Sequence, residues 1–265
     1  MKVMMLSWEY PPNQVGGLAK HVYYLSHSLS QEGTQVAVVT LGGHGTAPRE
    51  SEDNLEVVRT VPYFSNAPDF TTWVMHANFG LLEAGLGLTR EWGEPDIIHA
   101  HDWLVVYAGK ALKNLLRIPL AATIHATEHG RNSGIHNPTQ KYISDMEWWL
   151  TYESWRVVCC SHYMREELQR VFNLPGDKIR VIPNGVNLPA VGSVGGTVRG
   201  AAGGIVTATG GTVIGTARGT AVGGAARSAG RDFFARPKER IIFHVGRQVP
   251  EKGGAILLDA FASVL

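Results

Sequence analysis

The stretch SWEYPPNQVGGLAKHV (Ser7–Val22) decides the fold, because it joins a short apolar run, Lys2–Leu6, to a segment with helical periodicity. Apolar residues recur in that segment at spacings of four, three and four, which places them on one face of a helix: Leu18, Val22, Leu25 and Leu29. Gly33 is placed to end the helix, and the β-branched run 35–41 follows it. The chain therefore opens with a predicted strand, helix and strand.

The same alternation continues along the chain. We predict further strands at 95–101, 120–126, 156–161 and 178–185, and further helices at 103–116, 141–155 and 162–172. Strands that alternate with helices indicate a parallel sheet with both faces covered. The predicted fold class is therefore α/β, a doubly wound, Rossmann-like parallel sheet.

The composition changes abruptly at 189–230, a segment of 42 residues with 13 Gly and nine Ala but no aromatic, acidic or lysine residue. We interpret it as a flexible low-complexity linker or insertion, with irregular hairpins or a damaged stretch of gene as alternatives. Residues 1–188 then form an N-terminal domain. Residues 231–265 contain one strand, a loop and a helix, and we interpret them as the incomplete start of a second Rossmann-like domain, because one such unit cannot cover both faces of its strand.

Charge and cysteine content narrow the class of protein. The 24 basic and 23 acidic side chains leave a net charge of +1, which gives no sign of nucleic-acid binding. No apolar run approaches the roughly 20 residues of a membrane span, and the first residues lack the pattern of a signal peptide. The two cysteines, Cys159 and Cys160, are adjacent in an apolar strand, which predicts inert packing and a reduced, cytoplasmic protein.

Glycines and cations follow two of the predicted strands, at the strand ends where parallel sheets bind ligands. Gly16 and Gly17 open the first helix, where exposed backbone N–H groups suit a phosphate, although a plain turn is an alternative. Arg247 and Lys252 lie in a loop ahead of the last helix and suit a diphosphate, although a solvated basic loop is an alternative.

Histidines gather at the other predicted strand ends, in His99–Trp103 and His125–Arg131. His99 and His101 alternate along one strand, and His125, His129 and His136 are candidates to approach them. None of their spacings matches a known metal site, so we predict no bound metal. His99 is interpreted as a hydrogen-bonded core residue, and His125 as a donor to a substrate hydroxyl or a charge stabiliser.

Aromatic residues cluster in the predicted helix 141–155. Trp148, Trp149, Tyr152 and Trp155 recur at helical spacing, which favours core packing, with stacking on sugar rings as the alternative.

In combination these segments resemble a known family. Six segments carry the resemblance, in this order: EYPPNQVGGLAKHV, PDIIHAHDW, TIHATEHGR, EWWLTYESWRVVCCSHYM, DKIRVIPNGV and GRQVPEKGG. Together they resemble the retaining nucleotide-sugar glycosyltransferases with two Rossmann domains, known as the GT-B type, in the glycogen-synthase-like branch of group 1. The resemblance covers the chain apart from 47–92 in part and 189–230 wholly. It implies transfer of a hexose, glucose, from UDP-glucose or ADP-glucose to a glucan or other acceptor with retention of configuration, and no metal or other cofactor.

The resemblance also implies roles for individual residues. Gly16 and Gly17 would bind the donor diphosphate, Arg247 and Lys252 would neutralise the leaving nucleoside diphosphate, His125 would contact the donor sugar near the reacting carbon, and Glu9, His101 and Asp102 would line the acceptor side. Gln14 and Val15 stand where these enzymes often carry a lysine. The family's two late glutamates lie beyond Leu265, so we expect a truncated chain that is inactive alone. A non-catalytic remnant or carbohydrate-binding module is the alternative, and an epimerase explains these segments less well.

Overall fold

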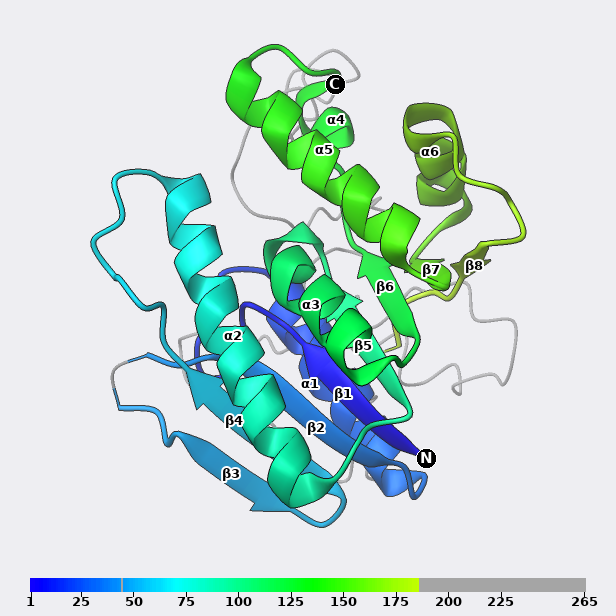
Figure 1. The fold of residues 1–265 in the computed structure, drawn as a ribbon. Helices are drawn as coiled ribbons and strands as arrows, with labels where there is room; N and C mark the ends of the chain where they lie inside the picture. The colour runs from blue at the N-terminus through cyan, green and yellow to red at the C-terminus, as the bar shows by residue number, and fades with distance from the viewer. Residues whose placement is uncertain (44, 186–265) are drawn as a thin grey trace, which may run out of the picture. The chain divides into compact units, whose positions relative to one another are not determined.

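A computed structural model describes residues 1–43 and 45–185 of the chain. Their eight-stranded sheet has the order β3-β4-β2-β1-β5-β6-β7-β8 (Figure 1). The strands are β1 (Lys2–Leu6), β2 (Gln35–Leu41), β3 (Arg49–Glu52), β4 (Leu55–Thr60), β5 (Ile97–His101), β6 (Leu120–Ile124), β7 (Arg156–Cys159) and β8 (Ile179–Val181). Neighbouring strands are parallel except β3 and β4. The predicted Rossmann-like α/β fold is confirmed.

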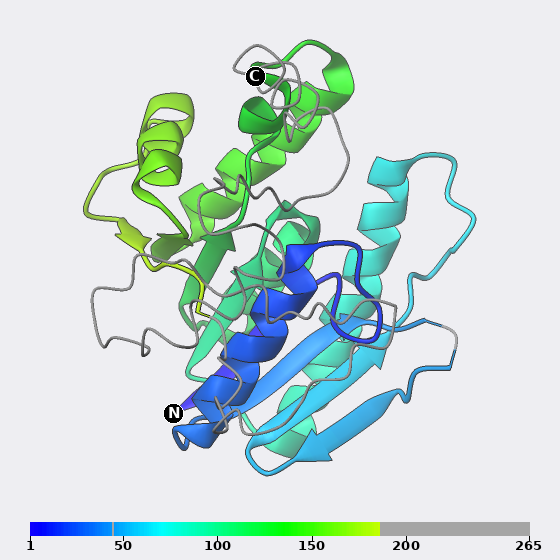
Figure 2. The same ribbon diagram turned by 180° about the vertical axis from the view of Figure 1, so that it is seen from behind.

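Helices connect the parallel strands. They are α1 (Gly17–Gln31), α2 (Phe70–Trp92), the 3₁₀ helix η1 (Trp103–Val105), α3 (Val106–Leu116), α4 (Glu128–Asn132), α5 (Pro138–Glu153) and α6 (His162–Phe172). Helix α1 covers one face of the sheet, and α2 and α3 cover the other (Figures 1 and 2). The predicted stop of the first helix is confirmed, because Gly33 adopts a positive φ of 82° two residues after α1 ends.

The core lies on both faces of β1. Met4 and Leu6 pack into the larger apolar cluster with α2 and α3, while Val3 and Met5 pack into a second cluster under α1. This division follows from the two-residue period of a strand, which sends successive side chains to opposite faces. A strand that is apolar at every position therefore needs helices on both sides, as in other parallel sheets.

Four elements lie where the sequence predicted none: β3, β4, α2 and α4. β3 is polar and fully exposed, so it carries no apolar alternation. Helix α2 contains Gly80, Gly85 and Gly87, residues that weaken a helix in isolation. Gly80 is required by packing, because a Cβ there would lie 2.5 Å from the carbonyl oxygen of Val61. Tertiary contacts thus stabilise α2 although its glycines lower its intrinsic helix propensity.

The order of the strands creates a switch point in the sheet. The chain proceeds outward from β1 to β2 and β4, returns through α2 to β5 beside β1, and then continues outward to β6, β7 and β8. The two directions diverge between β1 and β5. Crevices at the carboxyl ends of the strands on either side of such a point are the usual ligand sites of open α/β sheets.

The chain divides after Asn187 into two units, and the described residues all lie in the first. The sequence predictions for 189–230 and 231–265, with Arg247 and Lys252, therefore lie outside the described residues. Within the described part, no helix has both the length and the apolar character that a membrane span requires.

Candidate functional site

The loop between β1 and α1 is organised by a buried carboxylate. Glu9 is 4% exposed, and its side chain accepts hydrogen bonds from the backbone N–H groups of Val15, Gly16 (3.1 Å) and Ala19 (3.2 Å). The N-cap residue Gly16 has no side chain to cap the helix, so Glu9 performs this task from a distance. Its negative charge also lies at the positive end of the helix dipole.

Asp102 connects the ends of β5 and β6. Its backbone N–H donates to the carbonyl of Thr123, and its Oδ1 accepts from the backbone N–H of His125 at 2.8 Å. Asp102 has φ 61° and ψ 172°, a conformation that costs a non-glycine residue about 1–3 kcal/mol. Such strain is characteristic of functional sites, and here it orients a buried carboxylate toward the loop that carries His125.

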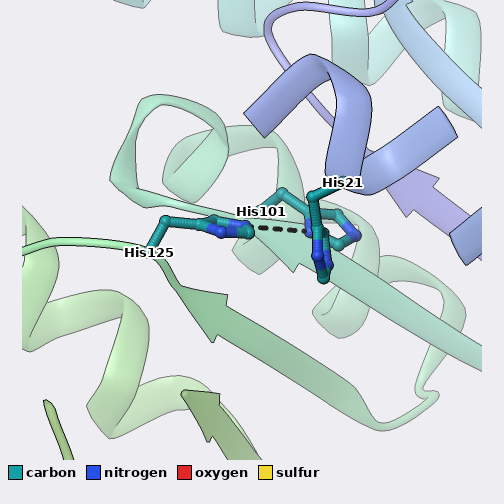
Figure 3. A group of neighbouring side chains, drawn as sticks. All are labelled: His21, His101 and His125. Carbon is teal, nitrogen blue, oxygen red and sulfur yellow. Dashed lines mark hydrogen bonds between the residues drawn. The ribbon is translucent and has the colours of Figure 1, made fainter. Parts of the chain in front are cut away.

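Three imidazoles meet beside this carboxylate (Figure 3). His21 comes from α1, His101 from the last position of β5, and His125 from the residue after β6. His125 Nε2 lies 3.5 Å from His101 Nδ1, and His21 Nδ1 lies 2.9 Å from the side-chain oxygen of Asn184. The rings of His21 and His125 are 4.6 Å apart and nearly perpendicular. The group lies at the switch point between β1 and β5.

Burial controls the charge of this group. Burial, with a smaller contribution from the neighbouring His125, lowers the pKa of His21 to about 4. Burial also lowers the pKa of His125 to about 4, although the Glu9 carboxylate opposes that shift. Burial raises the pKa of Asp102 to about 6, against the hydrogen bond from His125. At pH 7 the two imidazoles are neutral and Asp102 is mainly ionised, so the site carries negative charge.

Two buried glutamates hold the loop that follows His125. Glu147 on α5 accepts the backbone N–H of Glu128 at 2.8 and 3.0 Å, and Glu167 on α6 accepts the hydroxyl of Thr127. Thr127 in turn caps α4 by accepting from the N–H of Gly130. Burial raises the pKa of Glu147 to about 8, and Asp102 contributes to the shift. This pair fixes the position of the His125 loop.

The structure brings five of the predicted site residues to one end of the sheet: Glu9, Gly16, His101, Asp102 and His125. Gly17 is the first residue of α1, beside Gly16. Glu9, His101 and Asp102 are each at most 5% exposed. Their acceptor-side role, and the phosphate role of the glycines, stay predictions.

Three residues of this site were not predicted from the sequence: His21, Glu147 and Glu167. His21 follows Gly17 by four residues, one helical turn, which was a usable signal for its place beside the glycines. Glu147 stands in an aromatic and apolar stretch, and an acid in such a place indicates a buried carboxylate with a specific partner.

Of the other histidines, His99 bonds Thr123 through Nε2 at 2.8 Å, which supports its interpretation as a hydrogen-bonded residue of the sheet. His136 bonds the carbonyl of Asn132 instead of joining the cluster. Cys159 is buried and unbonded to Cys160, as the packing interpretation requires.

The core interpretation of the four aromatic residues in 141–155 is wrong for three of them, of which Trp155 lies just after α5. Trp148, Tyr152 and Trp155 are 44%, 63% and 58% exposed, and only Trp149 packs against the main core. The rings of Trp148 and Tyr152 stack with centroids 5.3 Å apart. They border a hollow of about 390 Å³. The error arose because the helical face toward the core is filled by smaller residues such as Ile143 and Leu150.

Comparisons with known proteins define the class. An uncharacterized glycosyltransferase of Methanocaldococcus jannaschii is 39% identical over 187 residues, covering 71% of this chain and 47% of its own. A glycogen synthase of Mycobacterium tuberculosis is 36% identical over 202 residues, which cover 71% of this chain and 49% of the synthase. The structure of a sucrose-phosphate synthase from Thermosynechococcus elongatus superposes with a TM-score of 0.61 at 18% identity, over 70% of this chain and 48% of that one.

The fold and these similarities place the chain in the class of GT-B-type glycosyltransferases. The chain belongs to Glycosyltransferase Family 4, whose pattern matches residues 15–189. It spans about half the length of the curated relatives that it matches.

Proposed function

We propose that the chain supplies the acceptor-side domain of a glycogen-synthase-like hexosyltransferase. The enzyme transfers glucose from UDP-glucose or ADP-glucose to a glucan, with retention of configuration. The observation that carries the proposal is the meeting of Glu9, Asp102 and His125 at the switch point of the sheet. The 36% identity to the mycobacterial glycogen synthase supports the choice of sugar and acceptor.

The electrostatics of the group suit an oxocarbenium-like transition state. A neutral His125 can donate a hydrogen bond to a sugar hydroxyl without placing a positive charge beside the developing cation. The buried carboxylates of Glu9 and Asp102 add negative potential in a region of low dielectric. The hydrogen bond from the backbone N–H of His125 to Asp102 fixes the backbone that carries the imidazole before substrate binds.

In this proposal Gly16 and Gly17 bind the donor diphosphate, Arg247 and Lys252 neutralise the leaving nucleoside diphosphate, and no metal ion takes part. The N–H of Gly16 already donates to Glu9 in this structure, so a phosphate has to share the N-terminus of α1 with that carboxylate. The adjacent cysteines and the cytosolic supply of nucleotide sugars favour a cytoplasmic protein.

The proposal is tested with the 265-residue chain and with a chimera that joins residues 1–187 to the donor domain of the mycobacterial relative. Each is incubated with radiolabelled UDP-glucose or ADP-glucose and glycogen. We expect transfer by the chimera, α-linked product, no transfer by its His125→Ala variant, and none by the 265-residue chain alone. A folded chimera that transfers glucose from neither donor to glycogen contradicts the proposal.

The exposed aromatic pair favours a second candidate function, carbohydrate binding without catalysis. Trp148 and Tyr152 present stacked rings beside a hollow that Asn173 and Lys178 also line, which suits a sugar ring and its hydroxyls. Glycogen in a native gel should retard the chain, and Trp148→Ala should abolish the retardation. Tyr163→Ala is the matched control, because Tyr163 is an exposed aromatic outside this hollow. Binding without transfer by the chimera selects this function.

A further inference from the structure

The three imidazoles of the site have the donor set of a transition-metal centre. One ring nitrogen from each of His21, His101 and His125 lies within 4.8 Å of those of the other two. Around a tetrahedral zinc ion with Zn–N bonds of about 2.0–2.1 Å, ligand nitrogens are roughly 3.3 Å apart. The 3.5 Å separation of His125 Nε2 and His101 Nδ1 is already close to this value. The third nitrogen, from His21, lies within 4.8 Å of both.

Some ring nitrogens of these three histidines have no hydrogen-bond partner in the described part of the protein. His21 Nε2 and His101 Nε2 are buried and have no hydrogen-bond partner among residues 1–43 and 45–185. His101 is fully buried, and its Nδ1 contact with His125 is longer than a normal hydrogen bond. Buried polar atoms in native proteins are usually paired, so the unpartnered Nε2 of His21 points to a ligand that it shares with His101 Nδ1 and His125 Nε2.

The surroundings fit a cation held by imidazoles. His21 Nδ1 contacts the side-chain oxygen of Asn184 at 2.9 Å, and an oxygen acceptor on the second nitrogen is what metal-bound histidines usually have. Asp102 and Glu9 are buried carboxylates that act electrostatically on the cluster. The three ligands come from α1, β5 and the β6 end, so packed elements fix their spacing. Nitrogen ligands select zinc and similar ions over magnesium or calcium.

We propose that His21, His101 and His125 form a binding site for a zinc-class transition-metal ion. The three imidazoles would be its ligands, and water would take its fourth coordination position. The ion is an inhibitor, not a cofactor. It occupies the ring nitrogen that His125 would offer to the sugar, and it adds positive charge where the transition state is positive. This inhibitory consequence rests on the proposed transferase function, whereas the metal site itself does not.

The binding test uses the metal-free 265-residue chain and Zn²⁺ in competition with a chromophoric chelator. We expect one tight equivalent in the wild type and at least tenfold weaker binding in His21→Ala. His27→Ala is the matched control, because His27 lies on the same helix and bonds its own backbone at Tyr23; it should bind like the wild type. Co²⁺ should give the intense visible absorption of a tetrahedral site in the wild type and lose it in His21→Ala.

Several results overturn the site: no stoichiometric Zn²⁺ in the wild type, equal affinity in His21→Ala, or an equal loss in His27→Ala. Circular dichroism checks the fold, and His21→Gln, which keeps the size of the side chain, replaces His21→Ala if the latter does not fold. In the chimera, micromolar Zn²⁺ should inhibit transfer and a chelator should restore it. Zinc binding without any transferase activity contradicts the proposed function but supports the metal site. Transferase activity without zinc binding supports the proposed function but contradicts the metal site.

Discussion

The carboxylate of Glu9 accepts the backbone N–H of Gly16 at 3.1 Å, although Gly16 lies seven positions further along the chain and the loop between them contains no helix. A carboxylate thus occupies the N-terminus of α1, the place that the sequence assigns to a phosphate. The interaction sets the entry of the chain into α1, and through α1 it sets the position of His21.

Glu9→Gln should lower the free energy of unfolding by about 1–3 kcal/mol, because a buried, charged acceptor of three backbone N–H groups is replaced by a neutral amide that also carries donors. Urea unfolding of the purified chain measures the loss. Glu32→Gln removes the same charge at the exposed, opposite end of α1 and should change stability by less than about 0.5 kcal/mol. Equal effects of the two substitutions contradict the capping role.

His125→Ala in the chimera should lower kcat by roughly 10²–10³-fold, as removal of one oriented hydrogen-bond donor does in other enzymes. The melting temperature should fall by less than about 4 °C, because the backbone bond to Asp102 remains. Turnover assays and thermal unfolding on the same preparations decide the matter. A sharp drop in melting temperature with turnover retained would identify His125 as a core residue.

The sequence was sufficient to predict the alternation of strands and helices and the strand ends where the site lies. It predicted less where tertiary contacts overrule local signals. The glycines of α2 argue against a helix until Gly80 is seen against Val61. Trp148 and Tyr152 have helical spacing, but spacing does not say which side of α5 faces the core. His21, Glu147 and Glu167 are far from His125 in sequence, so only the packing of α1, α5 and α6 reveals them.

Glu147→Gln should make stability less dependent on pH. The folded-state pKa of Glu147 is about 8, above the 4.5 of an exposed glutamate, so the folded protein retains this proton longer than the unfolded chain. Stability is therefore fully present below about pH 4.5 and declines as pH rises to about 8. Glutamine stays neutral over this pH range, so Glu147→Gln should lose roughly a few kcal/mol less unfolding free energy than the wild type as the pH rises. Urea unfolding at pH 5, 7 and 8.5 measures it.

Glu166→Gln, at an exposed position of α6, is the control for loss of one negative charge and should leave the pH profile of the wild type in place. If the unfolding free energies of the wild type and Glu147→Gln change with pH in the same way, the assignment of a protonated carboxyl to Glu147 is wrong.

Gly130→Ala should destabilise the loop that carries His125. A Cβ at Gly130 would lie 2.6 Å from Oε1 of Glu167, a buried carboxylate that also accepts the hydroxyl of Thr127. Glu167 cannot move away without losing that bond, so we expect a loss of about 1–3 kcal/mol in unfolding free energy. Gly87→Ala is the matched control, because Gly87 is at an exposed position of α2 where a Cβ meets no atom within 4 Å. That substitution should stabilise the helix by up to about 1 kcal/mol. Opposite signs for the two alanines in urea unfolding confirm the close contact, whereas two stabilising alanines show that Glu167 yields and that the loop is less tightly fixed than its hydrogen bonds indicate.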